Sequence, residues 1–155
     1  MYICMAIRYI HTNKQIEKAY NWANEIAPTY EKQNAYNRIA GIAAGKLAEE
    51  ACYAILKSQG YPVKEVEYPL HRDSGYDLGP PFSVKTSVKS KYPVSWAMYS
   101  TQDGLVSLCI SIISPHTTRF LGMVEIKDYI HLLKIPNSTT MAPGKMVLYR
   151  SDVGI

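Results

Sequence analysis

The amino-acid sequence predicts one domain of the mixed α/β (α+β) class. Helical periodicity fills most of the first sixty residues, and the two-residue alternation typical of strands follows Pro62. A further short helical pattern, at residues 126–133, precedes the last expected strand. The chain has 155 residues, of which 47% are hydrophobic, so it is long enough to bury a core. These observations predict a mixed sheet flanked by helices.

Two helices are expected before residue 60. Thr12 and Gln15 have the spacing of a capping box, and apolar residues then recur at helical intervals up to Ile26. Pro28 separates this helix from a second one over residues 30–59. Gly60, followed by Pro62, is a strong signal for its end.

Strands are expected over most of the remaining chain. Residues 105–113 are apolar enough to form a central strand, and Gly79 with two prolines predicts a tight turn. A polar loop is expected at residues 136–144. The full set of expected strands is 63–68, 76–78, 82–88, 95–99, 105–113, 120–124 and 145–150.

The sequence contains no pattern expected of a membrane or secreted protein. Its longest apolar stretch, residues 105–113, is far shorter than the ~20 residues of a membrane span. Its first ten residues lack the basic leader and cleavage site of a signal peptide. Three widely separated cysteines fit a reducing compartment. We therefore expect no membrane partner and a cytoplasmic, intracellular location.

The positive charge lies in the second half of the chain. Residues 78–155 hold eight Lys and Arg against four Asp and Glu, which accounts for the net charge of +4. The densest basic stretch contains Lys85, Lys89 and Lys91. A patch of this kind attracts phosphate groups, although a solvated face of a mildly basic protein explains the same charge.

One group of charged residues has the composition of a metal site. Glu49 and Glu50 lie on the second helix, and Asp77 precedes the predicted turn. A hairpin there would place Asp77 opposite Ser83, and Lys85 on the same face as Ser83. Mg²⁺ prefers one or two carboxylates together with water and phosphate oxygens. Each feature alone is common in proteins, where such side chains usually lie in turns or solvated surfaces.

The order of these features resembles the PD-(D/E)XK nuclease superfamily, which has the restriction-endonuclease-like fold. Residues 45–61, GKLAEEACYAILKSQGY, resemble the opening helix of that family. Residues 75–87, GYDLGPPFSVKTS, resemble its metal-binding hairpin. The resemblance implies a helical extension at residues 1–40, a catalytic core at 41–135, and a loop and edge strand at 136–155.

The resemblance also implies roles for individual residues. Glu49 and Asp77 would bind Mg²⁺ or Mn²⁺ together with the Val84 carbonyl, and Lys85 would assist the attacking water. The acidic ligand that normally stands two residues before the lysine is Ser83 here, which leaves an altered active site or an inactive one. Glu50 and Asp73 are the alternatives to Glu49 and Asp77. Residues expected to contact the nucleic-acid backbone are Arg72, Lys89 and Lys91.

We therefore expect a metal-dependent endonuclease acting on DNA, with RNA as a possible substrate. Cutting both strands favours a homodimer or a higher homo-oligomer, because symmetry then supplies two sites. The alternatives are a nucleic-acid-binding protein that lost cleavage through Ser83, and a small α+β protein without any role on nucleic acid.

Overall fold

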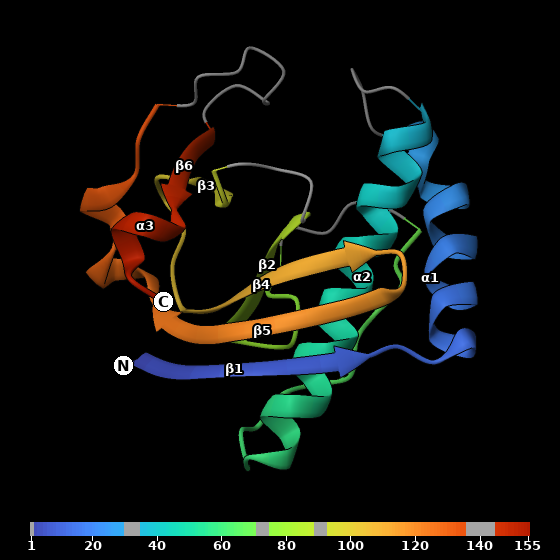
Figure 1. The fold of residues 1–155 in the computed structure, drawn as a ribbon, viewed down its shortest axis with the longest axis horizontal. Coiled ribbons are helices and arrows are strands. Elements are labelled where there is room, and N and C mark those ends of the chain that lie inside the picture. Colours follow the sequence, from blue (N-terminus) through green and yellow to red (C-terminus); the bar gives the residue numbers. More distant parts are fainter. Residues whose placement is uncertain (1, 30–34, 71–74, 89–92, 136–144) are drawn as a thin grey trace.

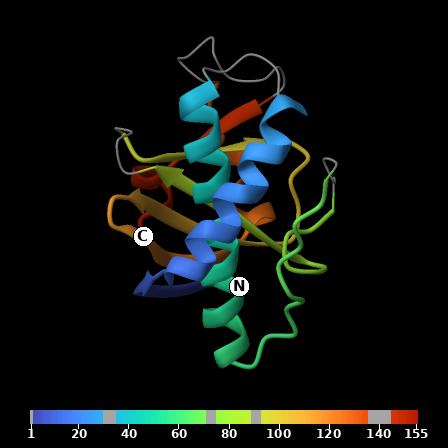
Figure 2. The same ribbon diagram turned by 90° about the vertical axis from the view of Figure 1, so that its right-hand side faces the viewer.

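The computed structural model describes residues 2–29, 35–70, 75–88, 93–135 and 145–155. It has three layers: two helices, a four-stranded sheet and a smaller two-stranded sheet (Figure 1). The elements are β1 (Tyr2–Ile10), α1 (Asn13–Ile26), α2 (Ala35–Ser58), β2 (Phe82–Val88), β3 (Ser95–Tyr99), β4 (Leu105–Ile113), β5 (His116–Glu125), β6 (Lys145–Tyr149) and α3 (Arg150–Val153). Figure 2 shows both long helices on one side of the main sheet.

The main sheet is mixed, with the strand order β1-β5-β4-β2. β1 and β4 each pair antiparallel with β5, whereas β2 pairs parallel with β4. The mixed α/β class with a sheet flanked by helices is therefore confirmed. β4 lies between β5 and β2, so residues 105–113 do form an internal strand, as their apolar character predicts.

α2 packs across one face of this sheet. Its small and apolar side chains, among them Ala48, Cys52 and Leu56, contact a core that includes Phe82 of β2 and Phe120 of β5. A register shift between β4 and β5 interrupts the alternation of β5, so that both Phe120 and Met123 face the helix. α1 covers α2 through Ala19 and Ala23, and the predicted capping box of Thr12 and Gln15 begins it.

β3 and β6 form a separate antiparallel pair on the other face of the main sheet. Trp96 and Met98 of β3 pack there with Leu148 of β6 against Val106 and Leu108 of β4. The Trp96 indole N–H donates to the Cys109 carbonyl at 2.9 Å, which ties β3 to β4. The chain therefore leaves the main sheet after β2 and returns to it at β4.

Several expected elements differ from the structure. Residues 2–10 form the edge strand β1, so the prediction of a helical extension over 1–40 is wrong for its first part. Residues 76–78 lie in a turn, and residues 63–68 follow an irregular path. The helix expected at 126–133 consists of two short 3-10 helices, Ile126–Asp128 and Ile130–Leu132.

The predicted strands 82–88, 95–99 and 105–113 are confirmed with the expected bounds. Residues 120–124 lie within β5, and residues 145–149 form β6. The expected loop at 136–144 lies outside the described residues. Within the described part of the chain, every helix is too short or too polar to span a lipid bilayer.

Candidate metal site

Asp77 is fixed by the turn that leads into β2. The Leu78 N–H donates to the Phe82 carbonyl at 3.1 Å, and the Phe82 N–H donates to the Gly79 carbonyl at 2.8 Å. This turn directs the Asp77 side chain back along the strand, where Oδ2 accepts a hydrogen bond of 2.8 Å from the Val84 N–H. The predicted strand pairing of Asp77 with Ser83 is thus replaced by a side-chain contact with Val84.

The Val84 contact places Asp77 at the open edge of the main sheet. β2 is an edge strand whose other side pairs with β4. The N–H and C=O groups of one residue in a strand point to the same side. Since the Val84 N–H points toward Asp77, the Val84 carbonyl is directed toward the same edge. A carboxylate and a backbone carbonyl, both hard oxygen ligands, therefore lie together there.

Glu49 approaches Asp77 from α2. Its side chain is only 16% exposed. Burial raises the pKa of Glu49 to about 8, and the negative charge of Asp77 contributes to the same shift. The pKa of Asp77 is itself raised by burial, although the Val84 N–H and the charges of Lys85 and Lys46 oppose that change. The negative charge of the partly buried Asp77 thus opposes ionisation of Glu49, and two such carboxyl groups provide an electrostatic setting in which a cation binds favourably.

Lys46, one turn before Glu49, supplies a positive charge to the same cluster. Its ammonium lies 3.2 Å from Glu49 Oε1 and donates to the Glu67 carbonyl at 2.7 Å. The side chain is 6% exposed and lies over the Trp22 ring, 4.4 Å from the centroid, and over Tyr68 at 5.1 Å. Buried lysines are rare unless paired, and these contacts supply the partners of Lys46.

Lys85 reaches Asp77 from the other face of β2. In the parallel register Lys85 is aligned with Leu108 and Ser83 with Val106, and both of these β4 residues face the β3–β6 layer. Burial lowers the pKa of Lys85, while the charge of Asp77 opposes that change. Asp77 therefore interacts with Glu49 on one side and with Lys85 on the other. Ser83 is buried and shares the face of Lys85, as the two-residue spacing predicts.

Glu50, the alternative to Glu49, has a different partner. The Tyr68 hydroxyl donates to Glu50 Oε1 at 3.1 Å, and the ammonium of Lys18 lies 4.4 Å from the centre of the Tyr68 ring. Trp22 donates from its indole N–H to the Pro69 carbonyl at 2.8 Å. Glu50 therefore helps to fasten the irregular segment after α2 to both helices.

Sequence reasoning missed Lys46, Trp22 and Tyr68. The only local signal was the three-residue spacing of Lys46 and Glu49, which places them on one face of a helix. Trp22 and Tyr68 come from segments far apart in the chain, and no sequence pattern connects them. Four other predicted site residues lie outside the described residues: Arg72, Asp73, Lys89 and Lys91.

Among the described residues, no three His, Cys, Asp or Glu side chains are grouped so that they could hold a metal ion. A metal here would depend on two carboxylates, a backbone carbonyl and water, which suits Mg²⁺ better than Zn²⁺. Comparisons with protein-family models, with curated proteins and with solved structures found no match for this chain.

Proposed function

We propose that the protein is a Mg²⁺- or Mn²⁺-dependent endonuclease that hydrolyses phosphodiester bonds in DNA, with a site of the PD-(D/E)XK type. The supporting observations are the hydrogen bond that holds Asp77 beside the edge-directed carbonyl of Val84, and the action of the Asp77 charge on Glu49.

In this proposal Glu49, Asp77 and the Val84 carbonyl hold the metal. A bound divalent ion supplies Lewis-acid polarisation of the phosphate and lowers the pKa of a coordinated water. The Val84 N–H fixes one oxygen of Asp77, which leaves the second oxygen as the candidate metal ligand. Lys85 lies within electrostatic reach of Asp77, and its ammonium orients the attacking water or stabilises charge on the phosphate.

Ser83 limits the affinity of this site for metal. A hydroxyl lacks the negative charge of the acidic ligand that it replaces, so the site holds two carboxylates where the resemblance implies three. We expect metal binding in the high micromolar to millimolar range, because ligand charge is a main determinant of affinity for hard cations.

The second candidate is a nucleic-acid-binding protein of the same fold that does not cleave. The observation that favours it is the ion pair of Glu49 with Lys46. The ammonium already occupies one oxygen of Glu49, and contacts with Glu67 and two aromatic rings hold it there. A permanent cation at Glu49 would compete with a metal.

The proposal includes an intracellular location and a homodimer. Cys52 and Cys109 are both buried free thiols, with their sulfur atoms 3.3 Å apart, which fits a reducing compartment. A homodimer would supply the two sites that are needed to cut both strands of a duplex.

Cleavage of supercoiled plasmid tests the proposal. We expect nicking that needs Mg²⁺ or Mn²⁺, and that falls at least 100-fold in Asp77→Asn and in Lys85→Met. Single-stranded and branched DNA, and RNA, should be assayed in parallel to define the substrate. Glu50→Gln is the matched control, since this neighbouring carboxylate binds Tyr68 instead.

Three results distinguish the two candidates. Metal-dependent cleavage that survives in both the Asp77→Asn and Lys85→Met variants excludes this site as the catalytic centre. Binding of DNA with no cleavage in either metal supports the inactive protein. In that case, the appearance of cleavage in Ser83→Asp would identify the missing ligand as the cause.

A further inference from the structure

Two arginines lie directly opposite each other on the main sheet, far from the candidate metal site. Arg8 of β1 pairs with Arg119 of β5 in the antiparallel register, and both side chains are exposed. Side chains at such opposed positions have Cβ atoms about 5 Å apart, and like charges placed there destabilise the sheet. An anion bound between the two guanidinium groups would offset this repulsion.

The protein itself supplies no such anion within the described residues. No acidic side chain in the part of the chain that the structure describes lies within 4.0 Å of either guanidinium. β1 and β4 contain no Asp or Glu, and the single acid of β5, Glu125, is at the far end of the strand and pairs with Lys127. The exposed part of this face, on β1 and β5, therefore carries two arginines at its centre and no acidic side chain there among the described residues.

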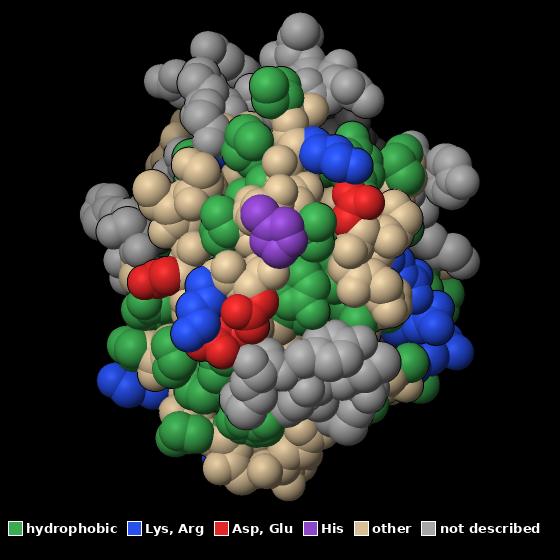
Figure 3. All heavy atoms as spheres, turned by 90° about the vertical axis from the view of Figure 1, so that its left-hand side faces the viewer, with side chains coloured by type: hydrophobic (Ala, Val, Ile, Leu, Met, Phe, Trp, Pro, Cys, Tyr) green, Lys and Arg blue, Asp and Glu red, His purple; other side chains and the backbone are tan. Residues whose placement is uncertain are grey.

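Several charged side chains on other parts of the molecule have partners within the protein. The face drawn in Figure 3 carries acidic and basic side chains next to one another. Two ion pairs elsewhere on the molecule are Lys127 with Glu125, at the end of β5, and Lys134 with Asp152, each at 3.0 Å. Arg150, at the start of α3, donates from Nε to the Ile155 carbonyl at 2.6 Å. Arg8 and Arg119 thus differ from these groups in having no such partner among the described residues.

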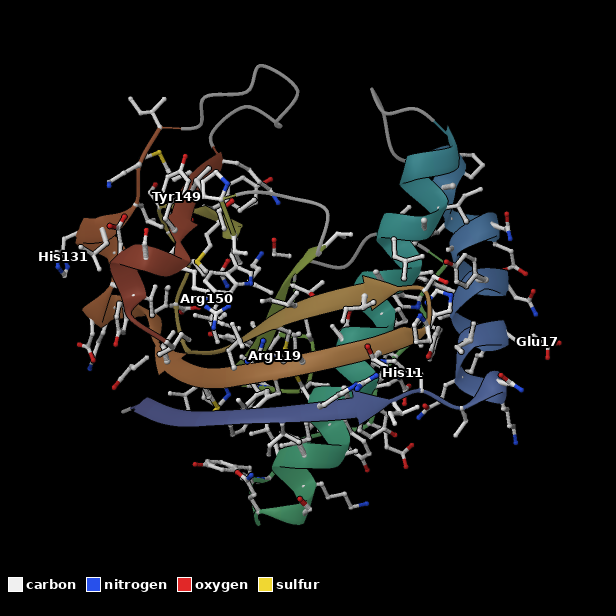
Figure 4. All side chains as sticks on the ribbon, in the orientation of Figure 1. His11, Glu17, Arg119, His131, Tyr149 and Arg150 are labelled. Carbon is white, nitrogen blue, oxygen red and sulfur yellow. The ribbon has the colours of Figure 1, made fainter. Side chains whose placement is uncertain are left out.

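Both arginines point away from the helices. Ile7 and Phe120, their chain neighbours, belong to the core under α2, so the alternation of the strands directs Arg8 and Arg119 to the opposite face. In Figure 4, α2 passes behind the strands, and the labelled Arg119 lies on β5 in front of it.

We propose that Arg8 and Arg119 form a binding site for the phosphate groups of a nucleic-acid backbone. Guanidinium groups present several N–H donors in a plane that matches phosphate oxygens, and two of them on adjacent strands can contact one phosphate or two successive ones. Ile10, on the same face and 70% exposed, offers an apolar contact for a sugar or a base.

This site goes beyond the proposed nuclease function and does not depend on it. β1 and β2 are the opposite edges of a four-stranded sheet, so Arg8 lies about 14 Å across the strands from the edge that carries Val84. Backbone contacts at Arg8 and Arg119 position a nucleic acid without selecting its sequence.

Fluorescence anisotropy with fluorescein-labelled 20-nucleotide DNA, as a single strand and as a duplex, tests the proposal. EDTA is present throughout, so that binding is measured without metal or cleavage. We expect Arg8→Gln/Arg119→Gln to weaken binding at least tenfold near 50 mM salt. The slope of log Kd against log salt should fall by about 1.8 for the duplex and about 1.4 for the single strand, the values for two phosphate contacts.

Two further variants make the result decisive. Arg8→Lys/Arg119→Lys keeps both charges and should retain most of the affinity. Lys14→Gln/Lys57→Gln removes the same net charge from exposed helix positions and should change Kd less than twofold. An equal loss in this control would show that net charge alone binds DNA, and would overturn the proposal. So would undetectable binding by the unaltered protein, or equally tight binding of a labelled Glu-rich peptide. Circular dichroism checks that each variant is folded.

Discussion

The Lys46 ammonium lies 3.2 Å from Glu49 Oε1, with the Lys46 side chain buried and the Glu49 side chain mostly buried. This ion pair connects Lys46 electrostatically to the candidate metal site, because the charge of Asp77 also acts on Glu49. Removing one member of a buried pair leaves the other charge without compensation, which generally costs more than the pair contributes.

We therefore expect Lys46→Met to destabilise the protein by about 3 kcal/mol at pH 9, where Glu49 is ionised. The effect should be smaller at pH 6, since a protonated Glu49 no longer needs a counter-charge. Urea denaturation at the two pH values measures the difference. The double variant Lys46→Met/Glu49→Gln should lose less than the sum of the single changes. Simple additivity would mean that the two side chains do not interact.

Glu49 should also make stability depend on pH in a defined direction. Its pKa is about 8 in the folded protein against an ordinary value of 4.5, so the folded state binds the proton more tightly. The contribution of Glu49 to stability is therefore complete below about pH 4.5. This contribution is lost as pH rises from there toward 8, by about 1.4 kcal/mol per pH unit. Glu49→Gln should flatten this slope between pH 5 and pH 8 (approximate limits set by the two pKa values). An unchanged slope would contradict the assigned burial of Glu49.

His11 should give stability the opposite dependence on pH. Burial lowers the pKa of His11 from 6.5 to about 4, and its Nε2 lies 2.7 Å from the Thr118 hydroxyl. A lowered pKa means that the folded state resists protonation. Stability should therefore be complete above pH 6.5 and should fall by up to about 3 kcal/mol as pH drops to 4. Thermal unfolding of His11→Gln, which cannot titrate, should lack this acid-dependent loss. His131→Gln is the control.

Much of the fold follows from local sequence signals. Residues 105–113 combine length with apolar character, and they form the internal strand that this combination predicts. The Thr12–Gln15 capping box likewise depends only on neighbouring residues. β1 was missed because its stability comes from pairing with β5, more than a hundred residues away. The parallel pairing of β2 with β4 was also beyond local signals, because β3 in between leaves for the other layer.

In the candidate site, too, some features follow from local sequence and others depend on distant residues. The charged residues Glu49, Asp77 and Lys85 stand out in the sequence by their order, and their electrostatic interactions in the structure connect them through Asp77. The contact of Asp77 with the Val84 N–H could not be predicted, because it depends on a turn and not on the expected strand. Lys46 was missed because its environment is built by two aromatic rings from distant segments.

Gly104 is a position where only glycine fits. It has φ of +83°, and a Cβ built there would lie 2.4 Å from the Pro81 carbonyl oxygen, which accepts the Leu105 N–H at 2.9 Å. Gly104→Ala would thus separate the start of β4 from the start of β2, at a predicted cost above ~3 kcal/mol. Gly154→Ala is matched in φ, at +81°, with open space around it, and should cost about 1 kcal/mol. Equal midpoints in urea for the two variants would contradict this packing.

In the proposed function, Glu49, Asp77 and the Val84 carbonyl bind one divalent cation at the edge of β2. Titration of Mn²⁺ into the protein at pH 8.5, followed by the electron paramagnetic resonance signal of the free ion, tests it most directly. We predict one bound Mn²⁺ per chain and an affinity at least tenfold lower in Asp77→Asn and in Glu49→Gln, with Glu50→Gln unchanged. No bound ion, or equal binding by the Asp77→Asn and Glu49→Gln variants, would contradict the account.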